Sequence, residues 1–209
     1  CEQAESSPDI PAATSSTRQV SYAELADKAS RVANHMRECG IRQGDSIGLL
    51  SNNRIEWLEI FFAASALGVV TVPFSTWSTA SELEYLINDS RVGWLFLIEH
   101  FGGQAFAANV SRLMSEQKVP LLKRCIAIDA SYKAFQNAEK LPQLAPSERA
   151  NPDDTLFVLY TSGSSSRPKA VPLLHAAAIE NGFNIGERQG LVRGDRVLVS
   201  IPLFWAYGA

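Results

Sequence analysis

The side chains best suited to chemistry in this sequence lie in one segment, Thr161 to Lys169. It reads T-S-G-S-S-S-R-P-K and follows a strongly apolar run, Leu156–Leu159, that predicts a buried strand. A glycine permits a backbone with positive φ, so that successive amide N–H groups and hydroxyls can converge on an anion. Lys169 adds a positive charge, and one charge pair at about 4 Å is worth roughly 4 kcal/mol at an effective dielectric near 20. The segment predicts a phosphate-binding loop, although Ser/Gly-rich stretches are more often plain surface loops.

Two other nucleotide-binding patterns, the Walker loop and the G-x-G-x-x-G turn, are alternatives to consider for this sequence. Gly163 and Lys169 have the spacing of a Walker loop, but Pro168 takes the place of its second glycine and Ala170 replaces the hydroxyl residue that would hold magnesium. A doubly wound dehydrogenase or kinase-like domain is disfavoured because no G-x-G-x-x-G follows a predicted strand; Gly102-Gly103 is incomplete. Neither class fits the residues present.

Read on to Val171, the stretch T-S-G-S-S-S-R-P-K-A-V resembles the Y-T-S-G-S-T-G-x-P-K-G-V signature of the adenylate-forming superfamily. That superfamily includes acyl-CoA synthetases, aryl-CoA ligases, luciferases and peptide-synthetase adenylation domains. Ser166 and Ala170 replace two glycines of the signature. If the loop needs a left-handed residue at 166, a non-glycine residue costs about 1–2 kcal/mol there. Such a cost would weaken nucleotide binding without abolishing it.

Three further segments resemble the same family in order and spacing: Val20–Leu25 (V-S-Y-A-E-L), Ala66–Pro73 (A-L-G-V-V-T-V-P) and Ile201–Gly208 (I-P-L-F-W-A-Y-G), the last with a tryptophan where histidine is common. The first two also have plain structural readings. Ser21 and Glu24 form a capping box, and 66–73 is a helix end followed by a β-branched strand. The resemblance covers the chain from about residue 20 to residue 209.

The resemblance implies roles for the loop and for the later aromatic segment. Thr161 would also lie near magnesium, and Lys169, as the catalytic residue, would steady the loop or the leaving pyrophosphate. The structural alternatives to these roles are that Lys169 is an ordinary exposed lysine and that Trp205 and Tyr207 are aromatic residues of the core. The residues implied to bind the ATP phosphates are Thr161, Ser162, Gly163, Ser164, Ser165, Ser166 and Lys169, and those implied to line the acid pocket are Phe204, Trp205, Tyr207 and Gly208.

The activity implied by the resemblance is a two-step ligase reaction with ATP and Mg²⁺. A small carboxylic acid is activated as an acyl-adenylate, and a thiol, that of coenzyme A or alternatively of a carrier protein, then accepts the acyl group. Amino-acid substrates are disfavoured because the stretch 204–207 contains no carboxylate to pair with an ammonium group, and a buried unpaired ammonium is costly. A truncated, non-catalytic nucleotide-binding module is the alternative function.

The family places several functional parts after the segment that ends this chain. They are the adenine-recognition segment, a magnesium-binding glutamate, a ribose-binding aspartate, a hinge and a C-terminal domain with a catalytic lysine. The resemblance therefore implies the front part of the large N-terminal domain, whose partner is the missing C-terminal part, and an inactive isolated chain. The start at Cys1 suggests a trimmed or processed end.

Composition supports these expectations. The net charge of −3 gives no basic field for nucleic acid, and the longest apolar run, around 60–72, is too interrupted for a membrane span. The three cysteines are far apart and odd in number, which argues against a disulfide framework; we expect reduced thiols and a cytoplasmic location. His35, His100 and His175 share no metal-ligand spacing, and the expectation is a structural His175. Asp153, Asp154 and Asp195 precede predicted strands and are expected to be turn or capping groups.

Helical and strand patterns alternate along the chain, which predicts an α/β fold with mostly parallel sheets flanked by helices. The expected divisions are a flexible lead-in (1–18), a first lobe (19–138), a connector (139–153) and the start of a second lobe (154–209). Expected helices are Ser21–Cys39, Ile55–Leu67, Ser81–Asn88 (capped by Thr79 and Glu82), Gln104–Gln117 and His175–Glu187; expected strands are Ser46–Leu50, Val69–Val72, Trp94–Ile98, Arg124–Ile128, Leu156–Tyr160 and Arg196–Ile201.

Overall fold

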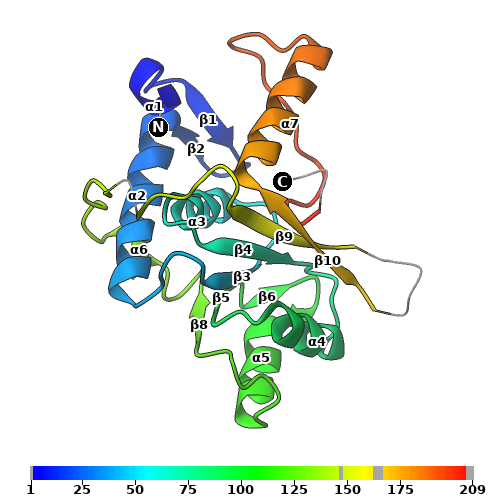
Figure 1. Ribbon diagram of the computed structural model, residues 1–209. Coiled ribbons are helices and arrows are strands. Elements are labelled where there is room, and N and C mark those ends of the chain that lie inside the picture. The colour runs from blue at the N-terminus through cyan, green and yellow to red at the C-terminus, as the bar shows by residue number, and fades with distance from the viewer. Residues whose placement is uncertain (1, 146–147, 162–166, 206–209) are drawn as a thin grey trace.

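A six-stranded sheet forms the centre of the computed structural model, which describes residues 2–145, 148–161 and 167–205 (Figure 1). The strand order is β10-β9-β4-β3-β5-β8. Only the edge strand β10 is antiparallel to its neighbour; the other pairs are parallel. The predicted α/β class with a mostly parallel sheet is confirmed. The strands are β3 (Ser46–Leu50), β4 (Val70–Phe74), β5 (Trp94–Leu97), β8 (Arg124–Ala127), β9 (Thr155–Thr161) and β10 (Lys169–Leu174).

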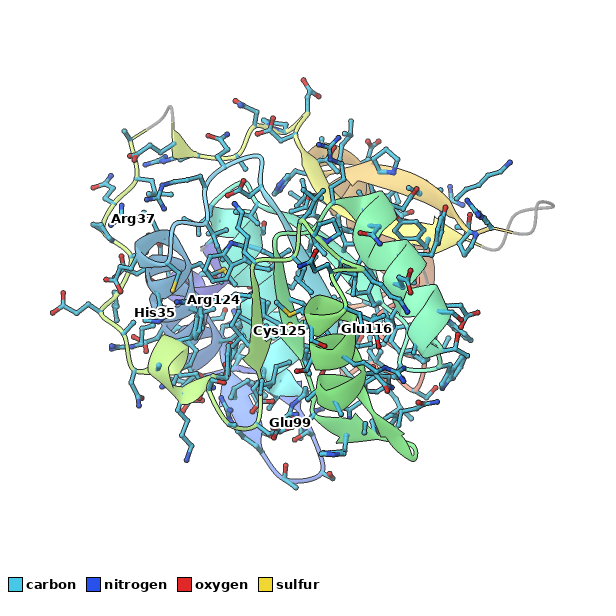
Figure 2. All side chains as sticks on the ribbon, turned by 90° about the horizontal axis from the view of Figure 1, so that it is seen from below. His35, Arg37, Glu99, Glu116, Arg124 and Cys125 are labelled. Carbon is cyan, nitrogen blue, oxygen red and sulfur yellow. The ribbon has the colours of Figure 1, made fainter. Side chains whose placement is uncertain are left out.

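Helices cover both faces of this sheet. The chain passes from β3 through α3 to one neighbouring strand, and from β4 through α4 to the other, and right-handed crossovers in opposite directions place the two helices on opposite faces. Helix α2 packs against α3, and α4 packs against α5. Figure 2 shows Arg124 and Cys125 of β8 between α2, which carries His35, and α5. The helices are α1 (Glu2–Ser6), α2 (Tyr22–Glu38), α3 (Ile55–Ala66), α4 (Ala80–Ser90), α5 (Phe106–Ser115), α6 (Lys133–Gln136) and α7 (His175–Gln189).

Local sequence signals start two of these helices where expected. Ser21 caps α2: its hydroxyl accepts from the Glu24 amide at 3.2 Å, and the Glu24 carboxylate accepts from the Ser21 amide at 2.8 Å. Thr79 and Glu82 form the same reciprocal box at the start of α4. Each box satisfies two helix-end N–H groups that would otherwise lack intrahelical partners. Both predicted capping boxes are confirmed.

The centre of the sheet is the best-packed part of the chain. Ile47, Leu49 and Leu50 of β3 are fully buried between the two helical layers. Gly48 is required among them, because a Cβ at this position would lie 2.8 Å from the side chains of both Leu95 and Phe74. Strands buried on both faces have continuous apolar sequences, which explains why the parallel strands were predictable.

A buried carboxylate joins three distant segments on the α2 side of the sheet. Glu59 of α3 is fully buried and accepts hydrogen bonds from Arg18 at 2.8 Å, from Gln136 at 2.8 Å and from the Tyr132 hydroxyl at 3.2 Å. Burial, with the nearby negative charge of Glu59, raises the pKa of Tyr132 well above its ordinary value. Because a buried charge without partners is costly, this cluster fixes the N-terminal hairpin and α6 on the core.

Several predicted elements are corrected by the structure. No strand forms at Arg196–Ile201, because 196–200 has no strand partner among the described residues. The helix predicted from Gln104 begins at Phe106, since Gln104–Ala105 (β7) pairs with His100–Phe101 (β6). Strand β10 was not predicted from the sequence. It contains Pro172, which a sheet accepts only where its missing N–H is not needed, as on an edge strand.

One continuous sheet contains strands from both of the lobes expected from the sequence. Strands β9 and β10, which follow the expected connector (139–153), join the sheet formed by residues before it. Pairing between β4 and β9 is limited to Thr71 and Phe157. The expected flexible lead-in contains α1 and β1 (Pro11–Thr14), which pairs with β2 (Gln19–Ser21). The division into two lobes stays a prediction.

Candidate functional site

The carboxyl ends of the parallel strands define one edge of the sheet. Residues 51–54 follow β3, residues 75–77 follow β4, and β9 ends at Thr161. Ligands of open α/β sheets bind in the crevice outside this edge. A candidate site should therefore lie where the predicted phosphate loop and the aromatic segment 201–205 reach this carboxyl edge.

Strands β9 and β10 form a hairpin on either side of the segment predicted to be a phosphate loop. Its last paired positions are Thr161 and Lys169, both exposed and opposite one another. Phe157 lies opposite Thr71 of the parallel strand β4, so the end of β9 lies beside the end of β4, at the carboxyl edge. The other predicted phosphate-binding residues lie outside the described residues; they are Ser162, Gly163, Ser164, Ser165 and Ser166.

The described groups at the end of the hairpin suit a phosphate better than a metal held by protein alone. A hydroxyl from Thr161 and an ammonium from Lys169 can both donate to phosphate oxygens. Magnesium takes six oxygen ligands, most of which would have to come from phosphates and water here. Among the residues that the structure describes, no group of three or more His, Cys, Asp and Glu side chains is placed to hold a metal ion.

The aromatic segment also reaches the carboxyl edge, where it meets a third aromatic residue. Phe204 is buried, and the ring of Trp205 is 44% exposed. Trp77, which follows β4, lies edge-to-face with both: its centroid is 4.8 Å from that of Trp205 and 5.8 Å from that of Phe204. Such edge-to-face pairs stabilise aromatic clusters by about 0.5–1.5 kcal/mol beyond area burial. Tyr207 and Gly208, also predicted for the acid pocket, lie outside the described residues.

Asn53 fastens this segment to the sheet. Its side-chain amide donates to the carbonyl oxygen of Ile201 at 2.9 Å, and its side-chain oxygen accepts from the Leu203 amide at 2.8 Å. The two bonds imitate the pairing of one strand with another. Beside them lies a cavity of about 260 Å³, lined by Asn52, Asn53, Thr76, Trp77, Phe101, Ser200, Pro202 and Phe204.

Sequence reasoning missed Asn53 and Trp77. Each lies three residues after the end of a strand that was predicted correctly or nearly so, and the carboxyl-edge rule would have directed attention to them. Trp77 is 61% exposed, which is unusual for so large an apolar side chain. An Asn-Asn pair and a tryptophan just after buried strands were therefore available signals.

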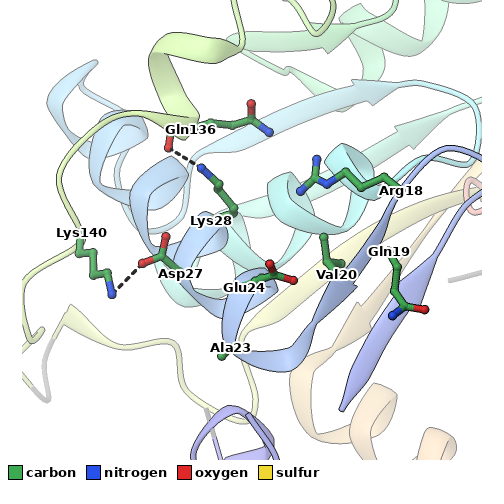
Figure 3. A pocket seen from close by; sticks show the side chains of 9 residues that line it. All are labelled: Arg18, Gln19, Val20, Ala23, Glu24, Asp27, Lys28, Gln136 and Lys140. Carbon is green, nitrogen blue, oxygen red and sulfur yellow. Dashed lines mark hydrogen bonds and ion pairs between the residues drawn. The ribbon is translucent and has the colours of Figure 1, made fainter. Parts of the chain in front are cut away.

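A larger open hollow of about 660 Å³ lies away from this edge, between α2, β2 and the segment after α6 (Figure 3). Its cations already have partners. Lys140 pairs with Asp27 at 2.7 Å, Lys28 donates to the Gln136 carbonyl at 3.4 Å, and Arg18 pairs with Glu59. The hydrogen bond from Arg31 and the Lys140 contact lower the pKa of Asp27. These pairings make the hollow a poor anion site, so the carboxyl edge is the candidate site.

The predicted turn aspartates occupy turns. Asp154 accepts from the Asn151 amide at 2.8 Å, which lowers its pKa, and Asp195 accepts from the Val192 amide at 2.8 Å. Burial lowers the pKa of His175, against the raising effect of Asp154. Its structural role remains a prediction. No helix in the described part of the chain is both long and apolar enough to cross a membrane.

A mostly parallel α/β sheet with a candidate site at the carboxyl ends of its strands is an arrangement found in many nucleotide-binding domains. The profile of the AMP-binding enzyme family matches residues 1–209, and the chain belongs to that family. It is 30% identical over 201 residues to an acyl-CoA ligase, sidI, of Aspergillus fumigatus, covering 90% of this chain and 34% of that protein. It is 31% identical over 204 residues to a feruloyl-CoA synthase of an Amycolatopsis species, covering 98% of this chain and 38% of that protein.

The fold is similar to that of solved structures. The N-terminal domain of FACL13 from Mycobacterium tuberculosis superposes with a TM-score of 0.87 at 25% identity, covering 97% of this chain and 50% of that chain. The chain spans about a third of the length of the curated relatives that it matches. The predicted membership of the adenylate-forming superfamily is thereby confirmed.

Proposed function

We propose that this chain belongs to an ATP-dependent acid–thiol ligase that activates a carboxylic acid as an acyl-adenylate and transfers the acyl group to a thiol, that of coenzyme A. The observation that carries the proposal is the meeting of two segments at one edge of the sheet. The hairpin that bears the phosphate loop ends there at Thr161 and Lys169, and the aromatic segment lies there on Asn53. Similarity to an acyl-CoA ligase and a feruloyl-CoA synthase supports the same activity.

The first step joins the acid to AMP. A carboxylate oxygen attacks the α-phosphorus of ATP, and the bond from that phosphorus to the bridging oxygen breaks, so that pyrophosphate leaves with the negative charge. Donors fixed in advance near the phosphates stabilise this charge. We assign that role to Lys169, to the Thr161 hydroxyl and to the hydroxyl and amide groups of residues 162–166. Magnesium, when bound near Thr161, would neutralise phosphate charge and orient the leaving group.

In the second step, the sulfur of a thiol gives up its proton to solvent and attacks the acyl carbonyl carbon. The bond from that carbon to the phosphate oxygen breaks, and AMP leaves with the electron pair. Coenzyme A is the acceptor that we propose; a carrier protein is the alternative. We assign Phe204, Trp205, Tyr207 and Gly208 to the acid pocket. Because Phe204 and Trp205 offer aromatic faces and no carboxylate lies in 204–207, we propose an aryl or aliphatic acid and not an amino acid.

The test is acid-dependent exchange of labelled pyrophosphate into ATP, measured with the full-length protein. Exchange should require the acid, and Lys169→Ala should lower its rate by about 10²-fold or more, as expected for loss of a charged donor to the leaving group. Lys123→Ala, which removes an exposed lysine just before β8, at the opposite edge of the sheet, is the matched control. Tight ATP binding without exchange, for any of a panel of aryl and aliphatic acids, would instead favour a non-catalytic nucleotide-binding module.

A further inference from the structure

The strand that follows the phosphate loop has little support from the sheet. Among the residues that the structure describes, β10 is the edge strand and pairs with β9 alone, and it has no buried residue over its whole length. The position of Lys169, its first residue, therefore depends on contacts made by the end of the hairpin. Helix α4 supplies two such contacts to the described residues.

The first contact holds β9. The Tyr160 hydroxyl donates to the Oδ2 atom of Asp89, near the end of α4, at 2.6 Å. This length is typical of a charge-assisted bond from a hydroxyl to a carboxylate, which is about twice as strong as a bond between neutral groups. Tyr160 directly precedes Thr161, so the bond fixes the backbone at the point where the loop begins.

The second contact holds the other side of the loop, one turn earlier on the same helix. The Tyr85 hydroxyl donates to the carbonyl oxygen of Pro168 at 3.3 Å, and the guanidinium of Arg167 lies over the Tyr85 ring at 5.4 Å from its centroid. Pro168 directly precedes Lys169. The two contacts thus flank the loop on both sides, and residues 85 and 89, four apart, lie on one face of the helix.

We propose that Tyr85 and Asp89 are positioning residues for ATP: they fix the two ends of the phosphate loop, and with them Thr161 and Lys169, against a helix whose start is itself locked by its capping box. This inference rests on the proposed function, because ATP is taken as the ligand of the loop. Neither residue is assigned a contact with ATP. Their effect is on geometry, and a displacement of about 1 Å at a reacting centre can cost about 10²-fold in rate.

The kinetic test uses full-length enzyme and the pyrophosphate-exchange assay. Asp89→Ala and Tyr160→Phe each remove the first contact, and each should raise the KM for ATP about tenfold, the scale of one hydrogen bond to a charged group, with the KM for the acid unchanged. The double variant should be no worse than either single variant, because both remove the same bond. Asp89→Asn keeps an acceptor oxygen and should restore most of the affinity. Tyr85→Phe should give a smaller rise, since it keeps the ring under Arg167.

Glu84→Gln is the matched control. It removes a carboxylate from the same helix, at a position whose charge acts on Lys118. Its KM for ATP should equal that of the unmodified enzyme. Equal KM values for ATP in the Asp89, Tyr160 and Glu84 variants, all folded, would overturn the inference.

A second readout does not depend on activity. Trypsin can cleave after Lys169, which is exposed, but not after Arg167, because Pro168 follows. Loss of the anchor should speed cleavage at Lys169 about tenfold in the Asp89→Ala and Tyr160→Phe variants and leave it unchanged in Glu84→Gln, by the same hydrogen-bond scale. If cleavage is faster in the variants but the unmodified enzyme does not bind ATP, the contacts of Tyr85 and Asp89 hold the hairpin and the proposed function is wrong. If cleavage is unchanged in the variants and the unmodified enzyme exchanges pyrophosphate normally, the positioning role of Tyr85 and Asp89 is wrong and the proposed function stands.

Discussion

The chain builds the same helix ending twice, at residues 36–47 and 186–197. Each helix stops at a glycine with positive φ, Gly40 after α2 and Gly190 after α7. In both copies the amide of the next residue bonds to the carbonyl oxygen five residues earlier, at 3.0 Å. This pattern is a Schellman ending, which needs a left-handed residue that glycine adopts without strain.

The turns that follow are also alike. In each, an aspartate two residues before the apolar pattern resumes accepts from the backbone amide three residues earlier: Asp45 from Arg42 and Asp195 from Val192, both at 2.8 Å. Four residues decide such a turn, so both copies form it from local sequence alone.

Beyond the turns the two copies differ. The first continues into β3, where Ile47 is fully buried with a strand on each side. The second continues into 196–200, where Val197 is 63% and Leu198 is 90% exposed and where no strand pairs with the segment among the described residues. Helix α7 likewise has no buried residue, whereas α2 has six. An apolar alternation specifies a strand only when a partner strand supplies its hydrogen bonds.

The largest effect expected from this comparison is a difference in the free energy of unfolding when the equivalent side chains Ile47 and Val197 are truncated. In the 209-residue chain, Ile47→Ala should lower the free energy of unfolding by about 2–5 kcal/mol, because a fully buried side chain leaves a cavity. Val197→Ala should change it by less than about 0.5 kcal/mol, as for other exposed positions. Urea denaturation followed by circular dichroism measures both. A comparable loss at the two positions would mean that 196–200 is packed in solution.

The next effect concerns how the second copy is held despite having no strand partner. Asn53, just after the strand of the first copy, supplies two side-chain hydrogen bonds to residues 201–203. Asn53→Ala should therefore release that segment, and amide exchange at Leu203 should become about thirtyfold faster, given two lost bonds of about 1 kcal/mol each.

Asn52→Ala is the matched control for this change, because Asn52 lines the same cavity, whereas the side-chain hydrogen bonds to the described residues 201–203 come from Asn53. Exchange at Leu203 should stay at its original rate in the control. The same slow exchange in the Asn53 variant would show that the segment is held by something other than these bonds.

The same contrast explains which parts of the fold were predictable. The central strands β3, β4 and β5 carry their own evidence, because nearly all their residues are buried and their sequences are therefore largely apolar. Capping residues Ser21 and Thr79 fix helix starts locally. Strand β10 escaped prediction and the expected strand at 196–201 was wrong for one reason: pairing depends on distant partners, which no local pattern reports.

The candidate site divides in a similar way. Residues Thr161 and Lys169 were predicted because a contiguous signature marks them, and the structure places them opposite one another. Asn53, Trp77 and Asp89 come from three separate segments, and only the fold brings Asn53 and Trp77 to the segment 201–205 and Asp89 to the hairpin. Sequence gives the residues that a family signature contains; the groups that position them depend on tertiary structure.

A smaller effect distinguishes the two turns: loss of one should change global stability, and loss of the other should change only local opening. Asp45→Ala should lower the free energy of unfolding of the whole chain by about 1 kcal/mol, since its turn joins two buried elements and loses one hydrogen bond. Asp195→Ala should leave that free energy unchanged and speed amide exchange only at Val192, because a segment with few buried contacts opens locally without global unfolding. Equal changes in urea midpoint for the two variants would contradict this distinction.

The smallest effect is a pH dependence at the base of α7. Burial lowers the pKa of His175 below its unfolded value of about 6.5, so the folded chain binds this proton less readily than the unfolded chain. The stability that depends on neutral His175 is present in full above about pH 6.5 and is lost as the pH falls through and below that value. Between pH 7.5 and 5.5 the urea midpoint should fall more for the unmodified chain than for His175→Gln. Asp154, whose pKa is lowered from an already acidic value, stays charged over this range and does not contribute to the difference. Parallel pH curves for the two proteins would mean that the first residue of α7 is as well solvated as the rest of that helix.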